Sequence, residues 1–218
     1  SFVLYKPKDV LSGDFYWLEK TKDTIFFAAC DCTGHGVPGA MVSVICSTAL
    51  NRAVKEFDIK DTGKILDKVR ELVLETFEKS ESEVQDGMDI SICAINTKTR
   101  ELKWSGANNP LWYLQNGEPK EVTANKQPIG KVDNPTPFTT HTVQLNKDDI
   151  IYVFTDGYAD QFGGPKGKKF KYKQLKELIL SIASKKMNEQ KDILFTAFEN
   201  WKGNLEQVDD VCIIGVRV

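Results

Sequence analysis

The sequence has few of the features that mark special classes of protein. Its 218 residues include only two histidines and five cysteines, and its 29 basic and 31 acidic residues nearly cancel to a net charge of -2. This balance excludes a global attraction to nucleic acid or to an anionic membrane, so any binding of phosphate has to be local. We therefore expect no nucleic-acid partner and no direct membrane contact.

The cysteines do not form a recognisable framework. They are odd in number, lie within apolar runs and show neither the spacing of a zinc site nor that of a disulfide scaffold. This pattern favours a reducing compartment. No apolar stretch reaches the roughly 18 residues typical of a membrane helix, and no signal peptide precedes the first strand-like residues. We expect a cytoplasmic protein.

Length and composition predict a folded globular unit. Hydrophobic residues make up 41% of the chain and charged residues 28%, which is ordinary for a globular protein. A chain of this length buries most of its apolar surface without crosslinks. Because the sequence starts at Ser1 and reaches strand-like residues almost at once, we interpret residues 1–218 as a single domain excised from a longer protein.

Two strands are predicted near the start of the chain. Residues 12–20, SGDFYWLEK, and 24–32, TIFFAACDC, read as a hairpin joined by a polar turn. In the second strand, the alternating faces that begin at Phe26 and Phe27 are both apolar or small. Such a strand is covered on both sides.

The remaining pattern predicts an α+β fold. Strands cluster around pairs of helices and do not alternate with single helices, which favours two mainly antiparallel sheets packed face to face with helices outside them. The first predicted helix begins near Pro38, and the other three cover about 64–79, 172–186 and 189–201. The further predicted strands cover residues 88–96, 100–106, 110–117, 137–145, 149–157 and 209–218.

Aspartates recur at the borders of the apolar strands: Asp14, Asp31, Asp156, and Asp209 with Asp210 beside it. One reading is that they cap turns, as aspartate beside glycine often does. However, buried carboxylates that lie together repel one another unless they are protonated or bound to a cation. A site made mainly of oxygen ligands favours Mg²⁺ or Mn²⁺ over zinc, and two such ions would activate water and hold a phosphoryl oxygen.

The segment after Asp31, TGHGVPGAM, supports a site at this corner. Its glycines allow the backbone to approach a metal or ligand closely, and the helix that begins near Pro38 directs its positive end to the same place. His35 lies inside this turn. Two roles are open for it: donating a proton to the leaving oxygen, or fixing the loop through a hydrogen bond to an aspartate.

Five motifs in order carry a resemblance to a known family: SGDFYW, DCTGHGVPGAM, DGMDISIC, FTDGYADQFGG and QVDDVCIIG. Together they make the chain similar to the metal-dependent serine/threonine phosphatases of the PP2C type, in their bacterial SpoIIE and RsbU-like branch. The resemblance covers essentially the whole chain. It implies a four-layer αββα sandwich with a site for two Mn²⁺ or Mg²⁺ ions at one edge.

The resemblance also implies roles for individual residues. Asp31 would bridge the two ions and the carbonyl of Cys32 would bind one of them, while Asp156 and Asp209 hold one ion and Asp14 serves the other. Asp210 remains the alternative to Asp209, since adjacent residues point to opposite faces of a strand. Water activated by the metals would attack phosphorus directly, without a covalent enzyme intermediate. Asp31 and His35 are the predicted catalytic residues.

The implied function is that of a serine/threonine phosphoprotein phosphatase. It would be the output domain of a bacterial signalling protein, with a phosphorylated protein as its partner and an anti-sigma-factor antagonist as a candidate substrate; a homodimer is left open. One alternative is a non-catalytic, signal-dependent interaction module with the same fold. Another is a two-metal phosphodiesterase, which the absence of a strong basic groove disfavours.

The chain departs from its relatives at the positions that would contact phosphate. Residues 107–110, Ala-Asn-Asn-Pro, provide no imidazole where many relatives have Gly-His-Asn-Pro, and only Lys6 and Lys8 lie near the first acidic motif, where better-known members have an arginine. The lysine-rich segment 163–176 is either a solvated loop that leads into a helix or a flap that docks an acidic or phosphorylated protein.

Overall fold

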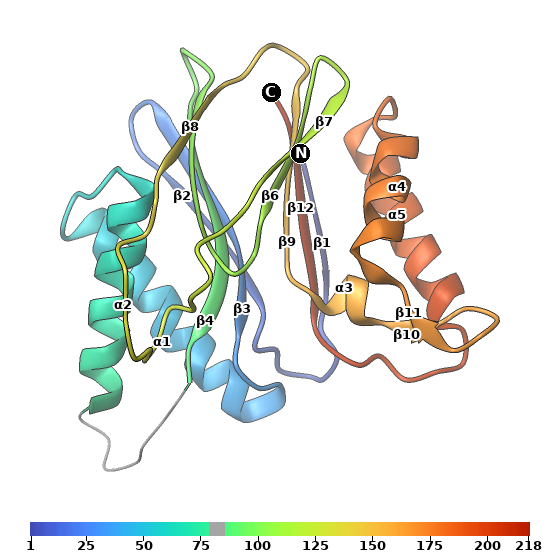
Figure 1. Cartoon of the computed structure of the whole chain (residues 1–218), viewed down its shortest axis with the longest axis horizontal. Helices are drawn as coiled ribbons and strands as arrows, with labels where there is room; N and C mark the ends of the chain where they lie inside the picture. The colour runs from blue at the N-terminus through green and yellow to red at the C-terminus, as the bar shows by residue number, and fades with distance from the viewer. Residues whose placement is uncertain (79–85) are drawn as a thin grey trace.

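Two β-sheets lie face to face at the centre of the molecule, and helices cover their outer faces (Figure 1). The computed structural model describes residues 1–78 and 86–218. The order of layers is therefore helices, sheet, sheet, helices, as predicted. Position 79, the predicted end of the second helix, lies outside the described residues.

Sheet A contains the first and the last strand of the chain, and all its neighbouring strands pair antiparallel. In spatial order it consists of β1 (Phe2–Lys6), β12 (Val211–Arg217), β9 (Ile150–Phe154), β6 (Leu111–Gln115) and β7 (Glu118–Val122). Sheet B is also antiparallel. It consists of β2 (Phe15–Lys20), β3 (Thr24–Cys32), β4 (Met88–Asn96), β5 (Glu101–Ala107) and β8 (His141–Gln144).

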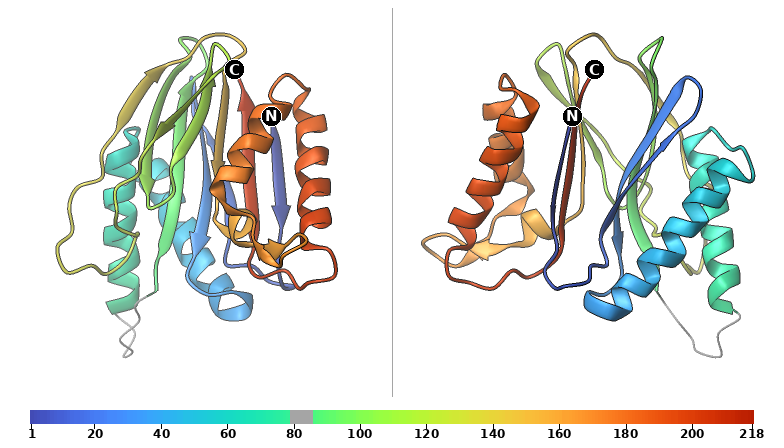
Figure 2. Two further views of the ribbon diagram at one scale, coloured as in Figure 1. Left: turned by 45° about the vertical axis from the view of Figure 1, so that its right-hand side comes forward. Right: turned by 180° about the vertical axis from the view of Figure 1, so that it is seen from behind.

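One helix pair covers each sheet, and the two pairs remain on opposite sides of the molecule when it is rotated (Figure 2). The pair on sheet B is α1 (Gly36–Lys55) and α2 (Thr62–Glu78). The pair on sheet A is α4 (Lys171–Ile182) and α5 (Met187–Lys202). Between β9 and α4 lie the short helix α3 (Gly157–Asp160) and a small hairpin of β10 (Phe162–Gly163) and β11 (Lys168–Lys169).

Strand β3 shows why the sequence specifies these layers. Phe26, Ala28 and Cys30 lie in the core between sheet B and its helices, whereas Phe27 and Ala29 lie in the core between the two sheets. Burial of each phenylalanine side chain contributes about 1.5–3 kcal/mol to stability. A shift of one residue in register would exchange the two faces, so this pattern strongly favours the observed pairing.

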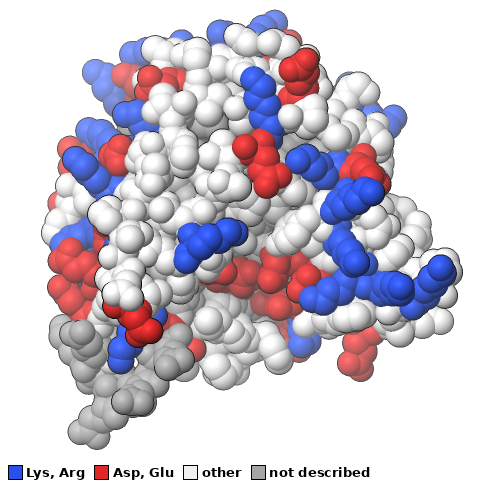
Figure 3. All heavy atoms as spheres, viewed as in Figure 1, with Lys and Arg blue, Asp and Glu red and all other residues white. Residues whose placement is uncertain are grey.

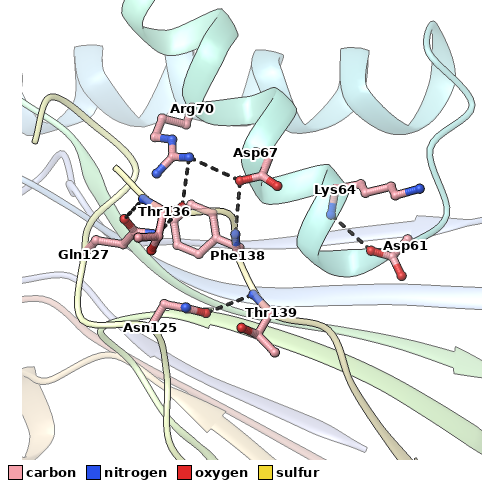
Figure 4. A network of polar contacts seen from close by, with 9 residues as sticks. All are labelled: Asp61, Lys64, Asp67, Arg70, Asn125, Gln127, Thr136, Phe138 and Thr139. Atoms are coloured by element: carbon pink, nitrogen blue, oxygen red, sulfur yellow. Dashed lines mark hydrogen bonds and ion pairs between the residues drawn. The ribbon is translucent and has the colours of Figure 1, made fainter. Parts of the chain in front are cut away.

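Most predicted elements are confirmed to within a few residues, and the exceptions have local causes. The strand predicted over 137–145 is reduced to His141–Gln144. The backbone N–H groups of Phe138 and Thr139 are bound by the side chains of Asp67 and Asn125, at 3.1 and 3.0 Å, rather than by a neighbouring strand (Figure 4). Strand β7 was not predicted, because its sequence EPKEV is polar and contains a proline, which suits only an edge strand.

Helix α1 corrects one expectation about apolar runs. By length and composition alone it is long enough and apolar enough to cross a membrane, with 39% of that window buried inside the protein. Its buried residues, among them Val42, Cys46 and Leu50, pack into the core beneath sheet B. Core packing thus accounts for much of its apolar composition. The same helix contains Cys46 and Arg52. Their spacing matches the Cys-x5-Arg signature of cysteine-dependent phosphatases, but that chemistry needs a loop of free backbone N–H groups, which this helical segment does not provide.

Candidate functional site

The predicted carboxylates come together because antiparallel strands bring the end of one strand beside the start of the next. Asp14 directly precedes β2, and Asp31 lies near the end of β3, where Phe15 pairs with Cys30. Asp156 follows β9, and Asp209 precedes β12, where Phe154 pairs with Ile213. Acidic side chains gather in one hollow at this end of the strands, with lysines beside it (Figure 3).

Asp210 ties the two sheets together at this edge. Its carboxylate is buried and accepts hydrogen bonds from the backbone N–H groups of Lys8 at 2.7 Å and Gly13 at 2.9 Å. A longer contact of 3.4 Å joins it to the N–H of Asp14. Asp209, in contrast, is exposed on the side of the other carboxylates. The structure thus places Asp209 in the acidic cluster and gives Asp210 a structural role.

The electrostatics of Asp14 and Asp31 show how strongly the cluster repels itself. Burial raises the pKa of Asp31 well above its usual range, and the charges of Asp156 and Asp209 add to this effect. Burial also raises the pKa of Asp14, followed by the charge of Asp31, while a hydrogen bond with Thr155 opposes the shift. Both effects are typical of carboxylates that a cation would stabilise.

The same mutual repulsion acts on Asp156 and Asp209. Burial and then the charge of Asp209 raise the pKa of Asp156 to about 6, although Lys169 opposes the shift. The pKa of Asp209 is also raised, first by burial, while a hydrogen bond from the backbone N–H of Asp210 and the positive charge of Lys8 lower it. Nearby positive side chains therefore offset the negative charge of the cluster only in part.

One further observation indicates that the cluster fits a divalent cation. Oδ2 of Asp14 is buried and has no hydrogen-bond partner among the described residues. Leaving such an oxygen without a partner is costly, and a hard cation is the kind of group that satisfies it. Even so, within residues 1–78 and 86–218 no group of three or more histidine, cysteine, aspartate or glutamate side chains is arranged to hold a metal ion. The fit thus rests on oxygen chemistry and mutual repulsion.

Two glycines allow the loops of this edge to pack closely. A Cβ on Gly13 would collide with the carbonyl oxygen of Gly34 and come within 3.0 Å of that of Cys32. A Cβ on Gly157 would collide with the carbonyl oxygen of Asp210. Because neither position carries a side chain, the segment of Asp14 packs closely against that of Asp31, and the segment of Asp156 against that of Asp209.

His35 and Cys32 lie at the site but have different surroundings. His35 is exposed, and its Nδ1 is 3.0 Å from Oδ2 of Asp9, which corresponds to the loop-fixing role. The thiol of Cys32 is buried, and contact with Cys46 and then burial raise its pKa far above the ordinary range. All five cysteines are buried free thiols. The catalytic role of His35 and the metal-binding role of the Cys32 carbonyl stay predictions.

The lysines near the first acidic motif are not equivalent. Lys6 forms an ion pair with Glu199 at 3.3 Å, so its charge is already used. The positive charge of Lys8 lowers the pKa of Asp209. In the lysine-rich segment, Lys169 pairs with Asp160 at 2.7 Å. Lys8 is therefore the better candidate of the first two for contact with an anion.

Asp89 was not among the predicted site residues, yet the structure places it beside the acidic cluster. It lies directly opposite Asp31 in the β3–β4 register, and its charge raises the pKa of both Asp31 and Asp156 after burial and closer charges. Its Oδ1 accepts a 2.8 Å hydrogen bond from Nδ2 of Asn108, within the turn that lacks an imidazole. The feature that could have indicated Asp89 in the sequence is its position at the start of a strand that pairs with the end of β3.

Comparison with known proteins identifies the family. The sequence profile of Stage II sporulation protein E (SpoIIE) matches residues 21–218, nearly the whole chain. The chain belongs to the SpoIIE family. No protein of curated function matches it.

Solved structures agree with this assignment. The SiaA-PP2C domain of Pseudomonas aeruginosa is 28% identical, with a TM-score of 0.90, over 100% of this chain and 85% of that one. The PP2C phosphatase domain of SpoIIE from Bacillus subtilis, solved with a fragment of its regulatory domain, is 20% identical, with a TM-score of 0.76, over 99% of this chain and 60% of that one. The RsbU and RsbW domains of Rv1364c from Mycobacterium tuberculosis are 19% identical, with a TM-score of 0.73, over 99% of this chain and 58% of that one. The resemblance to PP2C-type phosphatase domains and the sandwich fold are confirmed.

Proposed function

We propose that this SpoIIE-family domain is a metal-dependent serine/threonine phosphoprotein phosphatase that uses two Mn²⁺ or Mg²⁺ ions. The observation that carries the proposal is the convergence of Asp14, Asp31, Asp156 and Asp209 at one edge, with raised pKa values and a buried oxygen of Asp14 without a partner. Such an arrangement costs stability and is retained where it serves a function.

The residues that would hold the ions are those of the edge. The carboxylates of Asp14, Asp31, Asp156 and Asp209, together with the carbonyl of Cys32, would hold the ions. When bound, divalent ions lower the pKa of water and draw charge from a phosphoryl oxygen. RsbX, a neighbour with 17% identity and a TM-score of 0.65, was solved in complex with magnesium, which supports a divalent ion.

The groups of the chain itself favour direct attack by water. The nearest thiol, that of Cys32, is buried and its pKa is raised, so it is a poor nucleophile. Lys8 places positive charge beside Asp209, where it would attract the phosphate. Because Nδ1 of His35 already contacts Asp9, we assign His35 a catalytic role only through its other ring nitrogen.

The proposal extends to the setting of the domain. Neighbours that include an RsbU domain and a SpoIIE domain with part of its regulatory domain support a role as the output unit of a bacterial signalling protein. A phosphorylated anti-sigma-factor antagonist is the proposed substrate, and the five free thiols support a cytoplasmic location.

The test is phosphate release from an aryl phosphate and from a phosphoserine protein, with Mn²⁺ or with chelator. We expect Asp31→Ala and Asp156→Ala to lower kcat/KM by at least about 100-fold, as the loss of a metal ligand does. Asp192→Ala is the matched control, since Asp192 is exposed on α5. Circular dichroism would establish that each variant is folded.

Three outcomes would contradict the proposal. Full activity in excess chelator would exclude metal dependence. Binding of a phosphoprotein without turnover, unchanged by the aspartate substitutions, would instead support the non-catalytic interaction module. Cleavage of phosphodiesters in preference to monoesters would support the phosphodiesterase alternative.

A further inference from the structure

A groove opens beside the acidic edge, between sheet A and the start of α4. Its volume is about 470 Å³, large enough for several side chains of a polypeptide. Trp112 and Tyr172 form an aromatic wall, with ring centroids 6.1 Å apart in an edge-to-face arrangement. We call this feature the lysine groove; the residues used below are Asn108, Trp112, Lys126, Tyr172, Lys173 and Lys176.

The lysine groove adjoins the carboxylates at two points. On one side, Nδ2 of Asn108 donates a 2.8 Å hydrogen bond to Asp89, which lies opposite Asp31 across β3 and β4. On the other side, burial raises the pKa of Tyr172, and the charge of Asp156 adds to the shift, so the tyrosine lies within the field of the cluster. A chain bound in the groove would therefore reach the acidic edge.

The charge of the groove is opposite to that of the edge. Lys176 is neutralised by Glu121, at 3.1 Å, and lies over the Trp112 ring, 5.5 Å from its centroid. Lys126 and Lys173 are exposed, and neither forms an ion pair with any residue in the described part of the chain. The charge of Lys126 does act on Asp89, whose pKa it lowers. The groove thus has two exposed lysines without an ion pair, and both can contact carboxylates of a bound chain.

The backbone on both sides of Lys126 is held firmly. Asn125 accepts a hydrogen bond from the backbone N–H of Thr139 at 3.0 Å, and its own backbone donates to Gly106 and accepts from Asn108. The side-chain amide of Gln127 makes two hydrogen bonds to the backbone of Thr136, of 2.7 and 3.0 Å (Figure 4). The polar network around α2 therefore fixes the backbone position of Lys126, so that mainly its side chain has to be ordered on binding.

We propose that the lysine groove binds an acidic segment of the substrate protein adjacent to the phosphorylated residue. Lys126 and Lys173 would contact its carboxylates, and Trp112 and Tyr172 would pack against its apolar atoms. Such a site lets an acidic protein approach an edge that would otherwise repel it. This inference rests on the proposed phosphatase function, and it provides a role for part of the lysine-rich segment.

The experiment compares two phosphoserine peptides that differ only in their flanking residues, glutamates in one and lysines in the other. With wild-type protein and Mn²⁺, we expect kcat/KM to be about 10-fold higher for the acidic peptide, mainly through KM. Each of the two exposed lysine contacts should contribute about 3-fold, which lies within the usual range for exposed ion pairs. Added salt should reduce the preference, because exposed charges are screened.

The charge-reversed variant Lys126→Glu/Lys173→Glu should prefer the lysine-flanked peptide, an exchange that loss of structure alone would not produce. The matched control is Lys191→Glu on α5, an exposed lysine away from the groove, which should keep the wild-type preference. An aryl phosphate, which has no flanking residues, reports the catalytic edge separately. If wild-type protein hydrolyses the aryl phosphate but uses both peptides equally, the groove inference is overturned. If it hydrolyses none of them, the proposed function fails instead.

Discussion

Asp209 and Asp210 are adjacent in the chain, yet we expect their replacement to have opposite consequences. Asp210 is 1% exposed and accepts the backbone N–H groups of Lys8 and Gly13 at 2.7 and 2.9 Å. Asp209 is exposed beside the other carboxylates. Asp210→Ala should therefore destabilise the fold, whereas Asp209→Ala should leave it stable and remove the response to metal.

The magnitude follows from the hydrogen bonds that are lost. Each buried donor left without an acceptor costs about 1–3 kcal/mol. Removing the charge of Asp210 also relieves some repulsion, since that charge raises the pKa of Asp14 and Asp209. We expect a net loss of about 2–4 kcal/mol, which lowers the Tm of a chain of 218 residues by about 5–15 °C.

Asp209→Ala loses one acceptor, for the N–H of Asp210 at 2.8 Å, but relieves repulsion with Asp156 and Asp31. The two effects nearly cancel, so its free energy of unfolding should stay within about 1 kcal/mol of the wild-type value. Asp210→Asn is an informative intermediate. It keeps one oxygen acceptor but turns an NH₂ group toward a backbone donor, so it should also destabilise.

The assay is urea unfolding in chelator, followed by circular dichroism, together with calorimetric titration of Mn²⁺. Wild-type protein and folded Asp210→Asn should bind Mn²⁺, and Asp209→Ala should not. Equal losses of stability for Asp209→Ala and Asp210→Ala would refute the reasoning, because the structural difference between the two carboxylates would then have no energetic consequence. Normal Mn²⁺ binding by Asp209→Ala would refute its assignment to the metal edge.

Two further predictions concern the same edge. Without metal, Asp31→Asn should raise the free energy of unfolding by about 1 kcal/mol, because it removes a charge that the neighbouring carboxylates repel. Mn²⁺ at 100 times its Kd should stabilise wild-type protein by about 2.7 kcal/mol but should not stabilise this variant. Scanning calorimetry measures both effects, and equal stabilisation of the two proteins by Mn²⁺ would count against the site. Gly157→Ala should cost about 2 kcal/mol or more, because its Cβ would collide with the carbonyl oxygen of Asp210. Urea unfolding measures this loss, and an unchanged midpoint for Gly157→Ala would contradict this account.

Much of the fold could be predicted because its signals are local. The alternating apolar faces of β3 indicate a strand covered on both sides, and Phe26 and Phe27 do lie in two different cores. The helix predicted from Pro38 begins at Gly36, and the hairpin of β2 and β3 pairs as expected. The carboxylates at strand ends were also visible, since antiparallel pairing brings such ends together.

Other features depend on contacts between distant segments. No local pattern shows that Asp67 and Asn125 bind the backbone at Phe138 and Thr139, so the strand predicted there is too long. Asp89 becomes part of the acidic cluster only through its register with Asp31. Lys126 acquires its position only through the network that anchors its neighbours.

The sequence by itself determined the order of elements, the two-sided burial of the inner strands and the set of candidate carboxylates, because residue type and period act over a few neighbouring positions. Only the tertiary structure decided which member of the Asp209–Asp210 pair faces the cluster and which binds backbone. That choice depends on where Lys8 and Gly13 lie, at the other end of the chain, and on the bonds they make to Asp210. Long-range pairing of this kind has no periodic signal in the sequence.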